Sequence, residues 1–543
     1  MSANPYLQEV KFFQGRSTPY AAVLVGYAQL MRVLDQEFGT LVPAPDQLAL
    51  ISEKHHRHET QQWQVFTKRY QPKDDIVSHL VFALKYEGIQ LHILKALFQH
   101  KGEALIMDMV QARPTSQYTR RLWFLYEWLM DVRLDIPDLA KKMEYVEIVN
   151  PKFQYTGPVR NSTRHRVKNN LPGSREFCPL IRKTEKLEQL ISKHLDIQIE
   201  AGLSKVDKEL VRRSAAFLLL KDSKASFAIE GENPPSMRAR NWGKIIGQAG
   251  KNDLTIEEIE RLQHIVIGSK KLSHMGIRDV EGFIGEHDRD TFAPIPDHIS
   301  AKADDLPSLM HGLLEANNLL RGSEYDPVLT ATTIAFGFVF IHPLLDGNGR
   351  LHRYIIHHIL AKMGYTKMGI IFPVSAAILD RIGVYQEVLE AWSMPRLDFI
   401  DWKSTSDHNA EILNETIDLY RYYDMTSLAE FLFDCIEDTI DRIIPTELDF
   451  LRKYDQLAWV INEVVSLPNS RVDLLIKLLN QNGGKLSKTK RQRLFEDLAE
   501  IDIQIIEDSY QEIFNRENEF LDFGNTSFDT DDVPPDSDDM MID

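Results

Sequence analysis

The sequence predicts a mainly α-helical protein that carries one small β-hairpin. Helical periodicity dominates, because stretches such as "IVSHLVFALKYEGIQLHILKALF" and "RRLWFLYEWLMDV" place apolar residues at steps of three and four. The stretch "VLTATTIAFGFVFI" is apolar nearly all round, which predicts a buried helix. The stretch "GFIGEHDRDTFAPIPDHI" differs, because its glycines and prolines flank short apolar pieces and favour a hairpin.

Composition limits the class of protein. The chain has 543 residues, 43% hydrophobic and 26% charged, which is typical of a globular protein of roughly two to four domains. The net charge is −17, and the last 18 residues contain seven Asp and no Lys or Arg. An acidic chain lacks the basic footprint of a general nucleic-acid binder.

The same composition predicts a cytoplasmic protein. Two cysteines, Cys178 and Cys435, are too few for a disulfide framework, which favours a reducing compartment. The N-terminal residues lack a signal-peptide pattern. The longest apolar run, "TTIAFGFVFI", is far shorter than the roughly 18 residues that span a bilayer. We therefore expect no contact with a membrane.

Changes in pattern along the chain predict four regions. In order, they are a helical N-terminal region of unknown role (1–185), a helical core (205–400) that includes a helix at 207–231, a helical C-terminal region (410–525) and a disordered acidic tail (526–543). The stretch 150–180 is rich in Pro, Gly and Asn and is predicted to be a linker or long loop. An "NGG" turn in the C-terminal region favours a helix-turn-helix-like arrangement.

The stretch "FIHPLLDGNGR" joins the predicted buried helix to the next helix. Asp326 and Pro327 suit the N-cap and first position of the buried helix, and His342 emerges at its end. "DGNG" cannot easily continue a helix, and a second helix is predicted from Arg350, with Gly364 as its stop. Glycines allow backbone N–H groups to approach a ligand, and a helix N-terminus favours anions. This unit therefore predicts a phosphate site.

The side chains of this unit add chemistry to the phosphate site. Arg350 and Arg353 lie three residues apart on the first helical turn and could grip phosphate oxygens. Asp346 supplies a hard oxygen ligand for Mg²⁺. His342 could act as a general base near neutral pH. Together these groups suit a nucleotide phosphate and a hydroxyl group that must lose its proton.

The stretch "HPLLDGNGRLHR" resembles the Fic family signature HPFx(D/E)GNGRxxR. Eight of the nine fixed positions match, and Leu344 replaces the usual Phe at a position expected to pack inward. The resemblance covers roughly residues 205–400 and implies a Fic-type helical core. It also implies a protein adenylyltransferase that moves AMP from ATP to a Ser, Thr or Tyr hydroxyl of a protein, including its own.

The resemblance assigns roles to residues at matching positions. It implies that His342 is the base, that Asp346 holds Mg²⁺ and that Arg350 and Arg353 support the phosphates of ATP. The remaining implied roles are an anion hole formed by Gly347, Asn348 and Gly349, a target-binding flap that includes Phe283, Ile284 and Gly285, and an adenine pocket that includes Tyr385.

The stretch "SFAIEG" fits the family's inhibitory pattern (S/T)xxxE(G/N), with Ser226, Glu230 and Gly231 at the fixed positions. Its place at a helix end upstream of the core strengthens the match. Glu230 is expected to reach Arg353, occupy that arginine and crowd the γ-phosphate of ATP. The sequence therefore predicts an autoinhibited enzyme.

Several alternatives stay open from the sequence. The same site could remove AMP from a modified protein, or transfer another phosphate-bearing group, because the predicted anion loop does not read the base. A different class is a DNA-binding regulator, because "KTKRQR" in the C-terminal region could contact DNA. The N- and C-terminal regions are expected to select targets or to set the oligomeric state, with a homodimer among the states considered.

Overall fold

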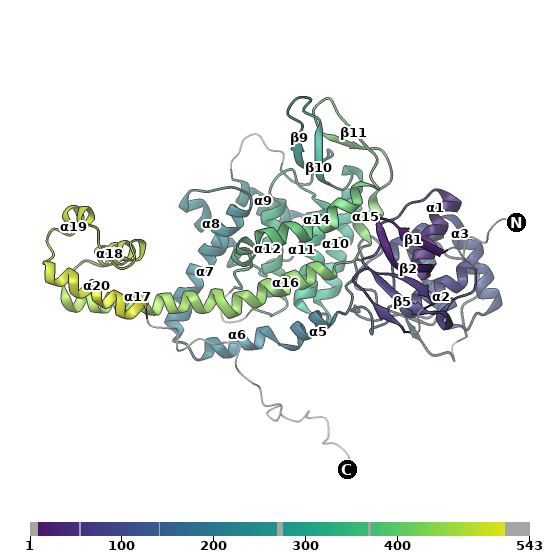
Figure 1. The fold of residues 1–543 in the computed structure, drawn as a ribbon, viewed down its shortest axis with the longest axis horizontal. Coiled ribbons are helices and arrows are strands. Elements are labelled where there is room, and N and C mark those ends of the chain that lie inside the picture. The colour runs from purple at the N-terminus through teal and green to yellow at the C-terminus, as the bar shows by residue number, and fades with distance from the viewer. Residues whose placement is uncertain (1–8, 54–55, 141, 269–274, 367–370, 516–543) are drawn as a thin grey trace, which may run out of the picture.

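The computed structural model of the chain describes residues 9–53, 56–140, 142–268, 275–366 and 371–515. The protein is mainly helical with small sheets, which confirms the predicted fold class. Figure 1 shows three parts in a row: an N-terminal α/β region, a central helical core and a C-terminal helical module that the long helix α17 joins to the core. Within these ranges no helix is long and apolar enough to cross a membrane.

The N-terminal region combines helices with two sheets. Its elements are β1 Glu9–Phe13, β2 Arg16–Val25, α1 Gly26–Phe38, β3 Leu48–Ser52, β4 His58–Glu59, β5 Trp63–Thr67, a 3-10 turn at Lys68–Tyr70, α2 Ile76–Tyr86, α3 Leu91–Ala112, α4 Gln117–Met130, β6 Val146–Glu147, β7 Arg160–Ser162 and β8 Val167–Asn169. The strand orders are β1-β2-β3-β5-β4 and β6-β8-β7. All pairs are antiparallel except β3–β5 and β6–β8.

The prediction of an all-helical N-terminal region is therefore wrong in part. The predicted helices at α2, α3 and α4 are present, but the stretch "YAAVLVGYAQLMRVLDQEF" is divided at Gly26 between strand β2 and helix α1. Gly26 has φ +57, a left-handed conformation that favours glycine and turns the chain. Apolar residues of both the strand and the helix pack into one core. The apolar pattern of the sequence therefore runs on through Gly26, although the secondary structure changes there.

The stretch 150–180 is not a linker. It contains β7 and β8 and packs between the N-terminal region and the core, with Leu171, Phe177 and Cys178 fully buried. Phe177 lies against Gly337 of the central helix, where an added Cβ would collide with its ring. Its prolines and glycines serve close packing, because added Cβ atoms at Gly157 and Gly173 would meet backbone atoms of neighbouring turns.

The core continues the chain with more helices and two hairpins. Its elements are α5 Glu185–Ser192, α6 Leu195–Ser204, α7 Lys208–Ile229, α8 Ser236–Ile246, α9 Ile256–Ile267, β9 Phe283–His287, β10 Pro294–Ile299, a 3-10 turn at Ala303–Asp305, α10 Leu306–Arg321, α11 Pro327–Ile341, α12 Asn348–Lys362, α13 Val374–Asp380, α14 Ile382–Leu397, β11 Trp402–Ser404, β12 Ala410–Ile412, α15 Ile417–Arg421 and α16 Thr426–Asp438. The predicted hairpin is β9–β10.

Helix α11 is the centre of this core. Every residue from Val328 to Ile341 is buried, as its apolar composition predicts. The hydroxyl groups of Thr332 and Thr333 donate to carbonyl oxygens four residues earlier, so these buried polar groups are satisfied. Asp326 caps the helix, as predicted, by accepting from the backbone N–H groups of residues 328 and 329.

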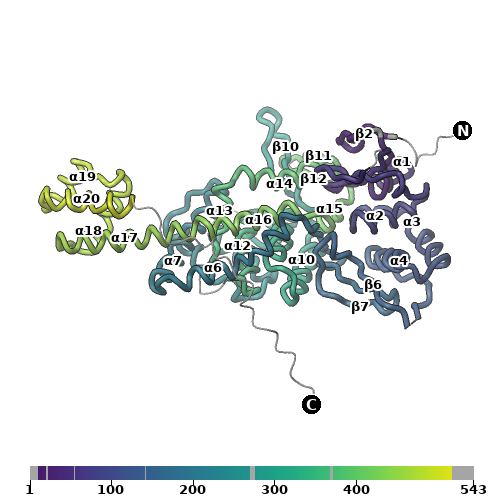
Figure 2. The backbone as a smooth tube through the Cα atoms, turned by 60° about the horizontal axis from the view of Figure 1, so that its bottom comes forward, coloured from purple at the N-terminus to yellow at the C-terminus, as the bar shows by residue number. Residues whose placement is uncertain are grey.

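The C-terminal module has its own small core. A π-helical turn at Thr439–Ile443 leads into α17 Ile444–Val464, and α18 Asn469–Gln481, α19 Lys488–Leu494 and α20 Glu500–Phe514 follow. Figure 2 shows these helices clustered around the far end of α17. The central core includes buried residues up to Leu448, and the module's core begins at Leu457. The predicted boundary near residue 410 therefore does not coincide with a break in packing, and the acidic tail lies outside the described residues.

Candidate active site at the end of helix α11

His342 caps the C-terminal end of α11 in a left-handed conformation, with φ +54. Its backbone N–H donates to the carbonyl oxygen of Phe338 at 3.0 Å. The side-chain Nδ1 lies 3.1 Å from the carbonyl oxygen of Val339. A carbonyl only accepts, so Nδ1 carries the proton in this arrangement and Nε2 keeps its lone pair. This is the tautomer that a general base requires.

Burial keeps His342 neutral. The pKa of His342 is lowered to about 4, chiefly by desolvation and with a smaller effect from the Arg278 guanidinium, against the opposing effects of the Val339 carbonyl and the Glu230 carboxylate. The imidazole is therefore unprotonated at neutral pH and able to accept a proton.

The loop after His342 is shaped by Asn348 and Gly347. The side-chain amide of Asn348 donates to the Leu344 carbonyl oxygen at 2.6 Å and accepts from the Leu344 backbone N–H at 3.0 Å. Leu344 itself is fully buried, as predicted for the position where the Fic signature usually has Phe. Gly347 caps α12 with φ +98, a conformation that L side chains rarely adopt. The loop is therefore closed by side-chain bonds, and helix α12 begins beside it.

Both arginines of the signature are buried and paired with carboxylates. Arg350 donates to Asp346 at 2.6 Å and to Glu232 at 2.9 Å. Arg353 donates to Glu230 at 2.8 Å and to the Ser226 hydroxyl and carbonyl oxygens at 3.1 and 2.7 Å. The sequence predicted the Glu230–Arg353 pair, whereas it did not predict that Glu232 holds Arg350.

The Glu230 carboxylate lies directly over the anion loop. An added Cβ at Gly349 would collide with Oε1 of Glu230 and crowd the other carboxylate oxygen. Burial raises the pKa of Glu230, but Arg353, Arg350 and His342 lower it by more, so the net pKa lies below its usual value. Glu230 is thus ionised at neutral pH and occupies the space beside the first turn of α12, where an anion would bind. Gly231 follows with φ +69 and ends the helix.

The contact between α7 and α12 extends further as a ladder of polar pairs. Asp222, Ser226 and Glu230 recur at four-residue steps on α7 and face the positions 357, 353 and 349 of α12. The fully buried Asp222 lies 2.8 Å from His357 Nε2 and accepts from the backbone N–H groups of Ser375 and Ala376. We call the three α7 residues and their α12 partners the α7–α12 ladder. The ladder residues recur at four-residue steps on both helices, and this spacing can be read from the sequence once the two helices are known to pack together.

Arg278 connects the β9–β10 hairpin to the loop at His342 and was not predicted. Its buried guanidinium donates to the carbonyl oxygens of His342 at 2.8 Å, of Val280 at 2.7 Å and of Ala301. Its backbone N–H donates to Pro343 at 2.9 Å. Burial lowers the pKa of Arg278 to about 10, which still leaves it charged. Both ends of the β9–β10 hairpin are thereby fixed against the end of α11.

The flap residues lie on the predicted hairpin. Phe283 packs towards a small apolar cluster with Ile299 and Ile412, whereas Ile284 is 43% exposed. Gly285 has φ +151, and an added Cβ would collide with the carbonyl oxygen of Ile295 on the paired strand. The hairpin stands out from the core beside the second hairpin, β11–β12 (Figure 1).

Tyr385 lies deeper than the sequence suggested. It is buried on α14, and its ring stacks near His352 at 6.2 Å and Phe431 at 5.8 Å between centroids. Burial raises the pKa of Tyr385 to about 12, and Arg353 is close enough to oppose this shift. Contact with an adenine ring would require this side chain to move, so that role stays a prediction.

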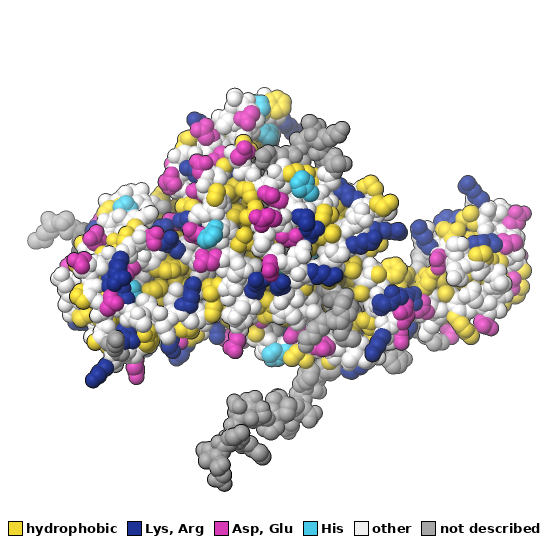
Figure 3. Space-filling view, turned by 180° about the vertical axis from the view of Figure 1, so that it is seen from behind, with side chains coloured by type: hydrophobic (Ala, Val, Ile, Leu, Met, Phe, Trp, Pro, Cys, Tyr) yellow, Lys and Arg dark blue, Asp and Glu magenta, His cyan; other side chains and the backbone are white. Residues whose placement is uncertain are grey.

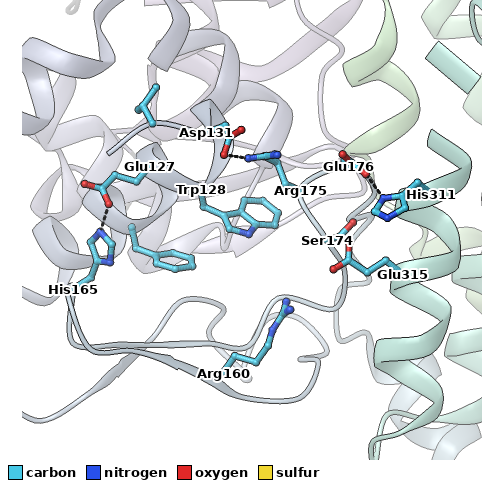
Figure 4. Close-up of a pocket in the computed structure, with 12 residues that line it drawn as sticks. Glu127, Trp128, Asp131, Arg160, His165, Ser174, Arg175, Glu176, His311 and Glu315 are labelled. Carbon is cyan, nitrogen blue, oxygen red and sulfur yellow. Dashed lines mark hydrogen bonds and ion pairs between the residues drawn. The ribbon is translucent and has the colours of Figure 1, made fainter. Parts of the chain in front are cut away.

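A second, polar cleft lies away from His342, between the N-terminal region and α10 (Figure 4). Its volume is about 510 Å³. Much of its charge is paired internally, because His165 lies 2.9 Å from Glu127, His311 lies 2.5 Å from Glu176, and Arg175 pairs with Asp131. The sequence gave no indication of this cleft.

One carboxylate of the loop suits the expected Mg²⁺. Among the described residues, no three His, Cys, Asp or Glu side chains converge as a metal-binding group. Mg²⁺ commonly takes one or two carboxylates together with substrate phosphates and waters. Asp346 is suited to that arrangement, because its side chain is 37% exposed beside the loop.

Comparison with known proteins identifies the region that holds this site. The Fic/DOC family matches residues 253–360. Proteins named protein adenylyltransferase Fic from Drosophila sechellia and Drosophila melanogaster are each 32% identical over 115 residues, which is 21% of this chain and 21% of theirs. The chain therefore contains a Fic/DOC domain, and the match spans about a fifth of the length of these relatives.

Two solved structures resemble the chain. A Fic family protein from Desulfovibrio desulfuricans G20 has a TM-score of 0.36 at 17% identity and covers 58% of this chain and 89% of its own. A Fic domain containing signaling protein from Bacteroides thetaiotaomicron VPI-5482 has a TM-score of 0.31 at 17% identity and covers 49% of this chain and 96% of its own.

Proposed function

We propose that the protein is an autoinhibited protein adenylyltransferase that moves AMP from Mg·ATP onto a Ser, Thr or Tyr hydroxyl. The observation that carries the proposal is the arrangement at the end of α11. A neutral histidine with a free Nε2 adjoins a glycine loop and a helix N-terminus, and two buried arginines stand on that helix. The Fic/DOC match and the relatives named adenylyltransferase support the same chemistry.

The reaction follows from these groups. Nε2 of His342 accepts the proton of the target hydroxyl, whose oxygen attacks the α-phosphorus of ATP. The bond to the bridging oxygen of the β-phosphate breaks, and pyrophosphate leaves. Backbone N–H groups at the start of α12 and the two arginines would stabilise the phosphate charge. Asp346 would hold Mg²⁺, which offsets phosphate charge when bound.

The α7–α12 ladder accounts for inhibition. While Glu230 holds Arg353 and covers Gly349, the triphosphate cannot use either group fully. Repulsion between the Glu230 carboxylate and the phosphates adds to the steric conflict. Activation then requires Glu230 to leave the loop.

The test is intact-mass spectrometry after incubation with Mg·ATP. The parent, Glu230→Gly and Glu230→Gly with His342→Ala are compared. An AMP-sized gain in Glu230→Gly that His342→Ala abolishes is the expected result. A gain that survives His342→Ala would overturn the assigned base. If no form gains mass, self-modification is excluded, and an AMP-modified protein is the next substrate, because AMP removal is the alternative at the same site.

The DNA-binding alternative has less support. Basic residues of the C-terminal module pair with acids, as in Arg491–Glu500 at 3.1 Å, Lys485–Glu507 at 2.9 Å and Arg471–Asp497 at 2.6 Å. On the face seen in Figure 3, acidic and basic side chains are interspersed over the molecule. Neither observation favours a phosphate-tracking surface.

A further inference from the structure

The C-terminal module exposes large apolar side chains on α17 and α20. Trp459 on α17 is 65% exposed, and Ile501 and Ile505 on α20 are 66% and 42% exposed. The module's own core is complete without them, because Leu457, Ile461 and Ile506 are buried against one another. Large apolar side chains exposed on two helices that pack together are a candidate interaction surface.

A groove of about 490 Å³ runs between these two helices. Its apolar lining is Trp459, Val460 and Ile513. Its charged lining consists of Asp455 and Glu512, with no Lys or Arg. Asp455 already pairs with Arg213, and Glu512 has an interaction of its own, so a ligand of this groove must compete for its carboxylates. A basic protein segment can compete in this way, whereas nucleic-acid phosphates cannot.

The exposed stripe on α20 continues the groove. Ile501, Ile505, Ser509 and Glu512 recur at steps of four and three, which places them on one helical face. From residue 501 to residue 512 this face is roughly 16 Å long at 1.5 Å per residue. A segment of about three helical turns would cover it, in the way that amphipathic helices bind apolar grooves.

We propose that the groove between α17 and α20 docks a cationic amphipathic helix of a partner protein, and that its occupation loosens helix α7. The link is Asp455, which lines the groove and accepts from Arg213 of α7 at 2.7 Å. A lysine or arginine of the partner competes with Arg213 for this carboxylate. Both side chains of the pair are partly exposed, at 32% for Arg213 and 46% for Asp455. Replacement of Arg213 by a cation of the partner therefore costs little free energy.

Helix α7 can carry the change to the active site. It is continuous from Lys208 to Ile229, and Arg213 is separated from Glu230 by roughly 25 Å of helix. Helix α17 packs along the same helix. Loss of the Arg213–Asp455 pair removes one of the contacts that hold the end of α7 opposite the anion loop, while Val211 and Leu218 stay packed in the core.

Binding is tested on the full-length protein with two synthetic peptides. One is a helical Leu/Lys peptide of about 18 residues, and the other has Glu in place of every Lys. The parent is expected to bind only the Lys peptide, measured by fluorescence anisotropy. Trp459→Ala and Glu512→Lys are each expected to weaken binding at least about ten-fold. Phe12→Ala, which removes a 63% exposed ring from β1, is the matched control and should bind like the parent.

The effect on α7 is measured by hydrogen exchange without ATP. The Lys peptide is expected to raise exchange in residues 208–230 several-fold in the parent. In Arg213→Gln the exchange should be high already and change little on binding. Because neither measurement uses ATP, failure of the proposed AMP transfer would leave both results intact.

Three results would overturn the proposal. Equal affinity of the parent, Trp459→Ala and Glu512→Lys would place the peptide elsewhere. A dimer in sedimentation velocity that Trp459→Ala abolishes would assign the groove to a second copy of this chain. Unchanged exchange in α7 with the peptide bound would show that docking and the helix are not coupled.

Discussion

Helix α7 is held at two places, and the two contacts differ in burial. Along its C-terminal half, Asp222, Ser226 and Glu230 meet α12, where Arg353 is 1% and His357 2% exposed at the side chain. Near its N-terminus, Arg213 meets Asp455 of α17 in a pair whose side chains are both partly exposed. The α12 partners of the ladder are therefore buried, although the Glu230 side chain is 33% exposed, whereas both partners of the α17 pair are partly exposed.

The difference shows which contact can be exchanged. Removing one partner of a buried pair leaves an uncompensated charge, which is costly, whereas a surface pair contributes little because water replaces either partner. The α7–α12 ladder therefore fixes the helix over the anion loop. The Arg213–Asp455 contact with α17 is the one that a partner could displace at a small cost in free energy, and the proposed docking acts on this contact.

The largest effect is expected from His342→Ala in the Glu230→Gly background. AMP transfer should fall by about 10²- to 10⁴-fold, because the general base is lost. The measurement is the initial rate of AMP incorporation from labelled ATP. His100→Ala, which changes an exposed histidine on α3 in the N-terminal region, is the control and should keep most of the activity. Equal rates with and without His342 would overturn the assignment of His342 as the general base.

Asp222→Asn should break the most buried part of the ladder. Asp222 is fully buried and accepts bonds from His357 Nε2, the Ser375 hydroxyl and two backbone N–H groups. We expect a loss of about 3 kcal/mol in the free energy of unfolding of the core, because a buried network loses its central acceptor. Urea unfolding followed by tryptophan fluorescence measures it. A loss under about 1 kcal/mol would show that the Asp222–His357 contact contributes no more to stability than the surface pair Arg213–Asp455.

Glu230→Gly should raise AMP transfer by about 10- to 100-fold, because a charged hydrogen bond in this setting contributes about 1.5–3 kcal/mol. Glu232→Gln should raise it less, because Arg350 keeps its bond to Asp346. Glu209→Gln alters an exposed acid in the first turn of α7 and should change nothing. A larger gain in Glu232→Gln than in Glu230→Gly would show that the Glu232–Arg350 contact inhibits AMP transfer more strongly than the Glu230–Arg353 contact.

The pH dependence reports the burial of His342. Its lowered pKa of about 4 means that kcat/KM in a Glu230→Gln variant should stay level as pH falls through 6.5 and decline only near pH 4. Glu230, whose pKa is lowered, keeps its pair with Arg353 as pH falls through the usual pKa of a glutamate and loses it only at still lower pH. An acid limb near pH 6.5 would show that His342 is solvated when active. Brief exposure to low pH followed by a neutral assay controls for unfolding.

The smallest effect is expected from Arg213→Gln. The free energy of unfolding should fall by less than about 1 kcal/mol, because the pair with Asp455 is partly exposed. Urea unfolding of this variant beside Asp222→Asn compares the two contacts of α7 directly. A loss as large as that of Asp222→Asn would contradict a loosely held N-terminal end.

The local features of the site could be predicted from the sequence. The apolar run up to Ile341, the capping pair Asp326–Pro327 and the glycines of "DGNG" fixed where α11 ends and where α12 begins to within two residues. The hairpin at Phe283 and the end of α7 at Glu230 were equally local. Turn chemistry and helix capping act over a few residues, so short stretches carry this information.

The N-terminal sheets could not be predicted in the same way. The strands β4, β6, β7 and β8 have two or three residues, too few to show an alternating pattern. The stretch 150–180 resembled a linker because its prolines and glycines suit loops. Only the packing of Phe177 against Gly337 shows that those residues serve contact between two regions.

The sequence by itself determined the catalytic motif, the order of the helices around it and the pairing of Glu230 with Arg353, which the resemblance implied. Only the tertiary structure decided that Glu232 holds Arg350, that Asp222 meets His357 and that Arg278 joins the flap to His342. These partners lie between 64 and 135 residues apart in the chain. Their pairing depends on how helices dock around α11, and no local pattern encodes that docking.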